Sequence, residues 1–228
     1  WMPTGIDDLD RLIGTSLRGG KQTVIAARPA MGKSALGQQM CMGFARANYG
    51  VGFFSLEMCA ADIVHRGWAM TSGVNLDRFQ RGNPSREEQE QIEDAMAEWM
   101  GLPLHISDSS TQTMSSIRSQ TRRLQMSMAR KGVKLGAICV DYLGLMGIEG
   151  GNTRSEAIGE ISRGLKRLAR ELDIATVILS QLNRKVEERS NKRPMLSDLR
   201  DSGDVEQDAD LILFLYREGY YREAALAG

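Results

Sequence analysis

The chain has 228 residues, of which 42% are hydrophobic and 25% are charged. This length and composition are typical of one large or two small globular domains with a substantial core. The 29 basic and 29 acidic residues give a formal net charge of zero, so the overall charge of the chain does not indicate nucleic-acid binding. Any nucleic-acid binding must therefore come from a local cluster of basic residues.

The sequence predicts neither a membrane span nor export. It contains no run of 18 apolar residues and no visible signal peptide. The three cysteines, Cys41, Cys59 and Cys139, lack metal-ligand spacing, and each lies in or beside an apolar run. We expect buried, reduced thiols and a cytoplasmic protein.

Six short apolar runs alternate with helical patterns along the chain. The runs span residues 23–26, 51–56, 104–106, 135–140, 174–179 and 211–215. Helical spacing of apolar residues is clearest over residues 35–48, 87–99, 117–128 and 158–172. Alternation of this kind predicts an α/β fold with a mostly parallel central sheet flanked by helices on both faces. Two stretches, 147–153 and 183–203, are predicted to be irregular, and loops of the second length are uncommon unless they are functional or disordered.

A phosphate-binding sequence follows the first apolar run. It reads Ala27-Arg28-Pro29-Ala30-Met31-Gly32-Lys33-Ser34-Ala35 and leads into a helical segment. A loop between a strand and a helix directs backbone N–H groups and the positive helix end toward an anion. Lys33 can reach the β- and γ-phosphates, and the Ser34 hydroxyl can ligate Mg²⁺. The usual phosphate-binding motif begins with glycine, and this chain has Ala27 at that position. The alternative interpretation of the segment is an ordinary turn between a strand and a helix.

Three further polar residues stand where predicted strands end. Asp141 follows a buried run and is placed to hold Mg²⁺, as in a Walker B motif. Glu57 follows the second run and is a candidate to polarise the attacking water, and Gln181 follows the fifth and can contact the γ-phosphate. Parallel strands present their carboxyl ends at one edge, where ligands bind. The alternatives are a turn aspartate, a solvated glutamate and a polar strand end.

The order of these elements resembles the RecA-like ATPase core. Longer sequence segments are more specific. They are Pro3-Thr4-Gly5-Ile6-Asp7-Asp8-Leu9-Asp10, the loop itself, Phe54-Ser55-Leu56-Glu57-Met58, Val140-Asp141-Tyr142-Leu143, Ser197-Asp198-Leu199-Arg200-Asp201-Ser202-Gly203 and Glu206-Gln207-Asp208-Ala209-Asp210. Together these segments resemble the C-terminal motor domain of DnaB-type replicative helicases over almost the whole chain.

The resemblance implies a homo-hexameric ring that hydrolyses ATP with Mg²⁺ and moves along single-stranded DNA. It implies catalytic roles for Lys33, Glu57 and Gln181 and a DNA-binding segment that includes Arg200, Asp201 and Gly203. A primase and a helicase loader are the partners that it implies, and no membrane is involved. A segment of this kind contacts the DNA backbone and carries little sequence information.

The resemblance also implies that residues 1–228 are one domain of a longer protein. The family has a separate N-terminal domain with a linker helix, and a Lys-x-Arg pair on a later strand that reaches the γ-phosphate of the adjacent subunit. Neither is found here, so we expect the fragment to be a weak ATPase on its own. Two other functions stay open: a RecA-, RadA- or KaiC-like ATPase, and a nucleotide-gated interaction module without turnover.

Overall fold

The computed structural model describes residues 1–141, 144, 146 and 154–227. Tyr142, Leu143 and the predicted irregular stretch 147–153 lie outside the described residues. Within the part of the chain that is described, every helix is too short or too polar to cross a bilayer.

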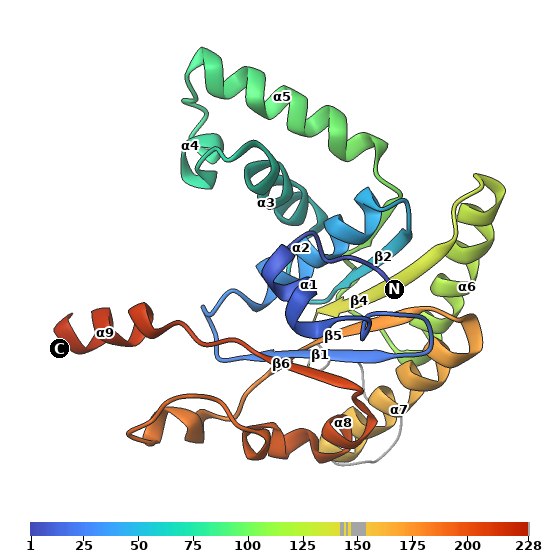
Figure 1. The fold of residues 1–228 in the computed structure, drawn as a ribbon, viewed down its shortest axis with the longest axis vertical. Helices are drawn as coiled ribbons and strands as arrows, with labels where there is room; N and C mark the ends of the chain where they lie inside the picture. Colours follow the sequence, from blue (N-terminus) through green and yellow to red (C-terminus); the bar gives the residue numbers. More distant parts are fainter. Residues whose placement is uncertain (142–143, 145, 147–153, 228) are drawn as a thin grey trace.

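A six-stranded sheet forms the centre of the molecule (Figure 1). Its strands follow the order β3-β2-β4-β5-β1-β6, and each neighbouring pair is parallel. Their bounds are β1 Gln22–Ala27, β2 Gly50–Ser55, β3 Leu104–Ser107, β4 Leu135–Asp141, β5 Ala175–Gln181 and β6 Leu211–Phe214. The predicted α/β class with a parallel central sheet is confirmed.

Helices connect the strands and cover both faces of the sheet (Figure 1). Their bounds are α1 Asp7–Ile13, α2 Lys33–Arg46, α3 Ala60–Ser72, α4 Leu76–Gln80, α5 Arg86–Gly101, α6 Met114–Arg130, α7 Arg154–Leu172, α8 Gly203–Asp208 and α9 Glu218–Ala227. Two 3₁₀ helices, η2 Arg184–Glu188 and η3 Leu196–Ser202, lie between β5 and α8. Residues 183–203, which the sequence predicts to be irregular, therefore contain local helical structure.

Two apolar layers hold the helices against the sheet. Val24 of β1 belongs to the layer that includes Leu165 and Leu168 of α7, whereas the next residue, Ile25, belongs to the layer that includes Phe44 of α2. Successive side chains of a strand point to opposite faces, so an unbroken apolar run supplies both layers. This explains why the strands could be found from apolar runs without alternation.

Helices α3, α4 and α5 form an arm that extends from one end of the sheet (Figure 1). The arm is closed by Trp99 of α5, which packs directly on Gly67 of α3, where a Cβ atom would lie 1.8 Å from the indole ring. The indole Nε1 donates a hydrogen bond of 3.1 Å to the Thr71 hydroxyl. Cys59, just before α3, is exposed, so the prediction that all three cysteines are buried is wrong for this residue.

The N-terminal segment is fixed against α2, the helix that follows the predicted phosphate-binding loop. Gly5 has φ +75°, and the Thr4 amide donates a 2.8 Å hydrogen bond to Oδ1 of Asp10. Gly43 of α2 allows the close approach, because a Cβ there would lie 2.0 Å from the Thr4 carbonyl oxygen. The glycine pair thus lets two backbones pack together without intervening side chains.

We predict that Gly43→Ala destabilises the protein, because backbone atoms of Thr4 would have to move. Forcing extra volume into a packed site costs about 1–3 kcal/mol. Urea unfolding followed by circular dichroism measures the change. Gly101→Ala is the matched control, since nothing lies within 4 Å of a Cβ at that helix end, and it should unfold at the wild-type midpoint or slightly above it. Equal midpoints for both variants would contradict the prediction.

Candidate nucleotide-binding site

The register of the sheet brings the predicted site residues to one edge. Ala27, at the end of β1, pairs with Gln181 at the end of β5. Asp141, at the end of β4, pairs with Ser55 of β2, two residues before Glu57. The Leu56 amide donates a 2.7 Å hydrogen bond to the carbonyl of Asp141, which fixes the turn that carries Glu57.

Two left-handed residues shape the loop between β1 and α2. Ala30 has φ +64° and Gly32 has φ +94°, and α2 begins directly afterwards at Lys33. Gly32 therefore stands where glycine is favoured on conformational grounds. Ala27, the departure from the usual first glycine, is the last residue of the β1 ladder and has no positive φ. Alanine is compatible with that position.

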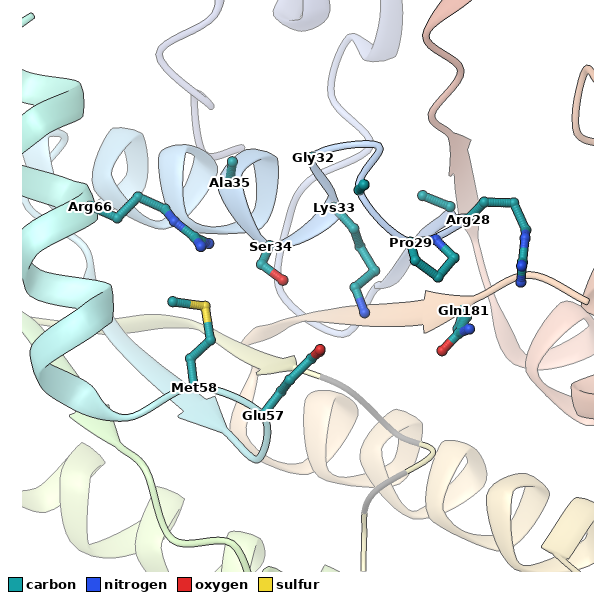
Figure 2. Close-up of a pocket in the computed structure, with 12 residues that line it drawn as sticks. Arg28, Pro29, Gly32, Lys33, Ser34, Ala35, Glu57, Met58, Arg66 and Gln181 are labelled. Atoms are coloured by element: carbon teal, nitrogen blue, oxygen red, sulfur yellow. The ribbon is translucent and has the colours of Figure 1, made fainter. Parts of the chain in front are cut away.

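A cavity of about 560 Å³ lies above this edge of the sheet. Its lining comes from the loop, the start of α2, the ends of β2 and β5, and α3: Ala27, Arg28, Pro29, Ala30, Gly32, Lys33, Ser34, Ala35, Glu57, Met58, Arg66 and Gln181. In Figure 2, the side chains of Lys33, Ser34 and Glu57 point into the same space, with Gln181 beyond Lys33. Met31 is the one residue of the predicted loop that does not line the cavity, and its side chain is buried.

Asp141 lies beneath Lys33 and is almost fully buried, with 1% of its surface exposed. Lys33 Nζ lies 3.4 Å from Asp141 Oδ1. Neither carboxylate oxygen accepts a hydrogen bond from any described residue. A buried carboxylate with so few partners is costly, and a nearby cation offsets that cost. Burial and a hydrogen bond with Cys41 raise the pKa of the neighbouring Cys139 thiol, which keeps it neutral beside Asp141.

These residues fit a magnesium ion that is held mainly by its substrate. The buried, under-satisfied carboxylate of Asp141 supplies the kind of hard oxygen that Mg²⁺ prefers, and the Ser34 hydroxyl lines the cavity above it. Among the described residues, no cluster of three His, Cys, Asp or Glu side chains could form a cage for a metal. Mg²⁺ commonly keeps several waters and binds one or two carboxylates together with substrate phosphates, so a cage is not required.

The Arg28 guanidinium points away from the centre of the cavity (Figure 2). It is 8% exposed and makes a two-pronged contact with Glu187 of η2, with Nε–Oε1 at 3.1 Å and Nη2–Oε2 at 3.2 Å. Nη1 also donates a 2.8 Å hydrogen bond to the carbonyl of Leu182, the residue after Gln181. Arg28 therefore ties the phosphate-binding loop to the segment that follows β5.

That segment continues to the predicted DNA-binding residues. The Asn183 amide donates to the carbonyl of Asp198, and Arg189 Nη2 lies 2.6 Å from the buried Asp198 carboxylate. Arg200 and Asp201 lie in η3, and Gly203 is the first residue of α8. The predicted site residues thus include a group that lines the cavity and a group in η3 and at the start of α8, later in the same segment.

Arg66 lines the cavity and was not found by the sequence analysis. It projects from α3 toward Ser34 (Figure 2) and gives the cavity a second cationic side chain beside Lys33. No motif spacing marks it. The available signal was its place in the second turn of the helix that directly follows the Glu57 turn.

Comparisons with known proteins decide the family. The family model of the DnaB-like helicase C terminal domain matches residues 2–227. The chain belongs to this family. A nucleotide-binding domain is what membership implies, and the recombinase and KaiC-like alternatives are not supported.

Named relatives and solved structures agree with this assignment. The chain is 42% identical over 229 residues to a "Probable plasmid replicative DNA helicase" of Chlamydia psittaci, covering 100% of this chain and 49% of that protein. It is 38% identical over 225 residues to "Replicative DNA helicase DnaB" of Geobacillus stearothermophilus, covering 97% and 48%. The chain thus spans about half the length of these curated relatives.

Two solved structures share the fold. One, described as an "ATPase Domain", superposes with a TM-score of 0.89 at 36% identity, covering 97% of this chain and 78% of that one. A chain described as "The Structure Of A DnaB-Like Replicative Helicase And Its Interactions With Primase" has a TM-score of 0.90 at 36% identity, covering 97% and 53%.

We predict that Arg28→Lys lowers the free energy of unfolding by about 1–3 kcal/mol. Lysine keeps the charge but cannot form the fork with Glu187 and also reach the Leu182 carbonyl. Arg46→Lys is the matched control, because the Arg46–Glu98 pair is exposed, with 45% and 41% of the two side chains accessible. Exposed pairs contribute about 0–1 kcal/mol. Urea unfolding measures both free energies, and an equally small effect for Arg28→Lys would show that the partly buried Arg28–Glu187 contact does not hold the segment.

Proposed function

We propose that this chain is the motor domain of a replicative DNA helicase, which couples ATP hydrolysis to movement along single-stranded DNA and to duplex unwinding. The observation that carries the proposal is the convergence of Lys33, Ser34 and Glu57 on one cavity, directly above the buried Asp141. Family membership supports the same function. The relatives are bacterial helicases, and replication would place this protein in the cytoplasm.

In the proposed reaction, the backbone N–H groups of the loop and the N-terminus of α2 bind the phosphates of ATP. Lys33 turns from Asp141 toward the β- and γ-phosphates and adds a positive charge where negative charge develops. Ser34 and Asp141 would hold Mg²⁺, which neutralises charge on the phosphate oxygens. Glu57 orients the attacking water and accepts its proton, and Arg66 adds a second positive charge to the cavity.

We propose that Gln181 senses the γ-phosphate and that loss of this phosphate changes the conformation of the DNA-binding segment. It lines the cavity at the end of β5, and the chain continues from it into η2 and η3. A hydrogen bond to the γ-phosphate would be lost on hydrolysis, and order–disorder changes in such segments are a known form of switch. Arg200 would contact a DNA phosphate, with Asp201 and Gly203 beside it in the segment.

The assembly and partners of the whole protein are also proposals. A homo-hexameric ring would let each subunit offer one Arg200 segment to a strand in the centre. The solved relative whose title names primase makes primase a candidate partner, and a helicase loader is a second.

Glu57→Gln should bind ATP with nearly wild-type affinity but hydrolyse it about 10²–10⁴-fold more slowly, because the amide cannot accept the proton of the water. Lys33→Ala should instead weaken nucleotide binding itself. Binding of a fluorescent ATP analogue and phosphate release, measured on the same samples, separate the two effects. Glu90→Gln, on exposed α5, is the control for loss of one acidic charge. Wild-type turnover by Glu57→Gln would rule out the proposed base, and no turnover by the wild-type chain with DNA present would favour the interaction-module alternative.

Arg200→Ala should weaken binding of single-stranded DNA similarly for all sequences. Each phosphate contact contributes about −0.7 to the slope of log affinity against log salt, so the slope should become less steep by about that amount. Fluorescence anisotropy with oligonucleotides of different sequence measures both quantities. Unchanged binding would place the single-strand contact elsewhere, with residues 184–193 or the stretch before α7 to be tested next.

A further inference from the structure

The outer surface of α6 and α7 is rich in arginine. Helix α6 has four arginines and no acidic residue along its 17 residues. The α7 residues Arg163, Arg167 and Arg170 are exposed as well. In a chain with zero net charge, this is a pronounced local excess of positive charge.

Two hollows run along this surface, one on each side of α7. The first, about 520 Å³, lies between α6 and α7 and is lined by Met114, Ser115, Arg118, Ser119, Arg122, Arg123, Met126, Gly164 and Arg167. The second, about 340 Å³, lies between α7 and the end of α8 and is lined by Arg163, Lys166, Arg167, Arg170, Gln207, Asp208, Ala209 and Asp210. Arg167 lines both, so the hollows form one continuous basic surface.

Among the described residues, ion pairs involve only some of the arginines of this surface. Arg118 and Arg122 share a single carboxylate, that of Glu171. The hydrogen bond from Arg122 lowers the pKa of Glu171, which stays ionised. Arg123 and Arg167 form no ion pair with any acidic group that the structure describes. Both are exposed, and both are therefore available to a ligand.

Of the two acidic residues that line the second hollow, Asp208 and Asp210, the second already has partners within the fold. Asp210 is held by Lys21 and Lys166 and by the Gln22 amide, which donates a 2.7 Å hydrogen bond to it. Burial acts to raise the pKa of Asp210, but these hydrogen bonds outweigh it and lower the pKa to about 2. The contacts of Asp210 therefore stabilise the fold, because its carboxylate binds Lys21, Lys166 and the Gln22 amide.

The chemistry of the lining favours phosphate groups over an acidic protein segment. An amphipathic helix needs apolar anchor sites at helical spacing. Here Met114 packs on Gly164, which leaves Met126 as the exposed apolar side chain of the first hollow. Guanidinium groups and serine hydroxyls, which both donate hydrogen bonds to phosphate oxygens, make up most of the remaining lining.

The lining also favours a duplex over a single strand. Proteins that hold single strands stack the bases on aromatic side chains. No aromatic residue is among the described residues that line either hollow. A duplex keeps its bases inside and presents phosphates alone. Successive arginines four residues apart on a helix are about 6 Å apart, which suits a row of phosphate contacts.

We propose that the α6–α7 surface binds the phosphate backbone of a DNA duplex, as a second DNA contact distinct from the Arg200 segment. The second hollow is lined by Gln207 and Asp208 of α8, which begins three residues after Arg200. DNA held by the Arg200 segment would therefore lie near this surface. This argument from the nearness of the Arg200 segment rests on the proposed function, whereas the argument from charge does not.

The test compares binding of the 228-residue chain to a fluorescent duplex of about 20 base pairs and to a single strand of about 20 nucleotides across a salt series. Arg123→Gln/Arg167→Gln should weaken duplex binding on the order of tenfold or more and reduce the steepness of the salt slope by about 1.8, since two phosphate contacts are lost. Single-strand binding should change less. The charge-matched control is Arg11→Gln/Arg86→Gln, on α1 and α5, which should leave duplex binding near the wild-type value.

Several outcomes would overturn the proposal. One is unchanged duplex binding by the Arg123/Arg167 variant with its circular dichroism spectrum intact. Another is an equal loss for the charge-matched control. A third is binding of poly-L-glutamate that requires Arg123 and Arg167, together with duplex binding that does not require them. That result would assign the surface to an acidic protein. If the glutamine variant fails to fold, Arg123→Lys/Arg167→Lys keeps both charges and should retain the wild-type salt slope, whereas a lost slope would count against the proposal.

Arg200→Ala, measured alongside, separates this inference from the proposed function. Loss of single-strand binding in that variant with duplex binding kept would support both assignments. Unchanged single-strand binding, with duplex binding lost only in the Arg123/Arg167 variant, would refute the Arg200 assignment and keep the second contact.

Discussion

The parallel register of β1, β4 and β5 is the constraint on which the site depends. Because all these strands run the same way, their carboxyl ends meet at one edge, and Asp141 and Gln181 arrive there next to the loop. The two apolar layers fix the register, since a slip by one residue would exchange the faces of every side chain. The position of Asp141 under Lys33 is therefore set by residues such as Val24, Ile25 and Cys139, which belong to the apolar layers and not to the cavity lining.

The Arg28–Glu187 contact links the cavity to the rest of the proposed motor. The loop that would hold phosphates and the segment that follows Gln181 are joined by this partly buried, two-pronged contact as well as by the backbone. From there the Arg189–Asp198 pair continues to η3. Both pairs have one partner that is at least nine-tenths buried, where breaking a pair costs more than at the surface. These two contacts therefore join the loop to η3, the element that contains Arg200.

Much of this fold could be predicted from the sequence, because buried parallel strands are unbroken apolar runs. All six were placed within one or two residues of their observed ends. The positions of Glu57, Asp141 and Gln181 could be predicted because each of these polar residues marks the abrupt end of an apolar run. The helix α3 was not predicted, since its buried face is narrow, with Ile63 and Gly67 as its buried residues. The 3₁₀ helices were missed because they carry no apolar repeat, and Arg66 was missed because only the packing of α3 brings it to the cavity.

The zero net charge of the chain conceals how its charges are arranged. Helix α5 carries Glu87, Glu88, Glu90, Glu93, Asp94 and Glu98 against a single arginine, whereas α6 carries arginines and no acid. Charges on separate elements do not cancel at contact range, because screening limits their reach to about 8–10 Å at ordinary salt. A total that excludes binding through overall charge is therefore compatible with a strongly basic surface on one side of the molecule. Whether a basic surface is free to bind the proposed DNA depends on the pairing of individual arginines, and that pairing can be read only from the folded chain.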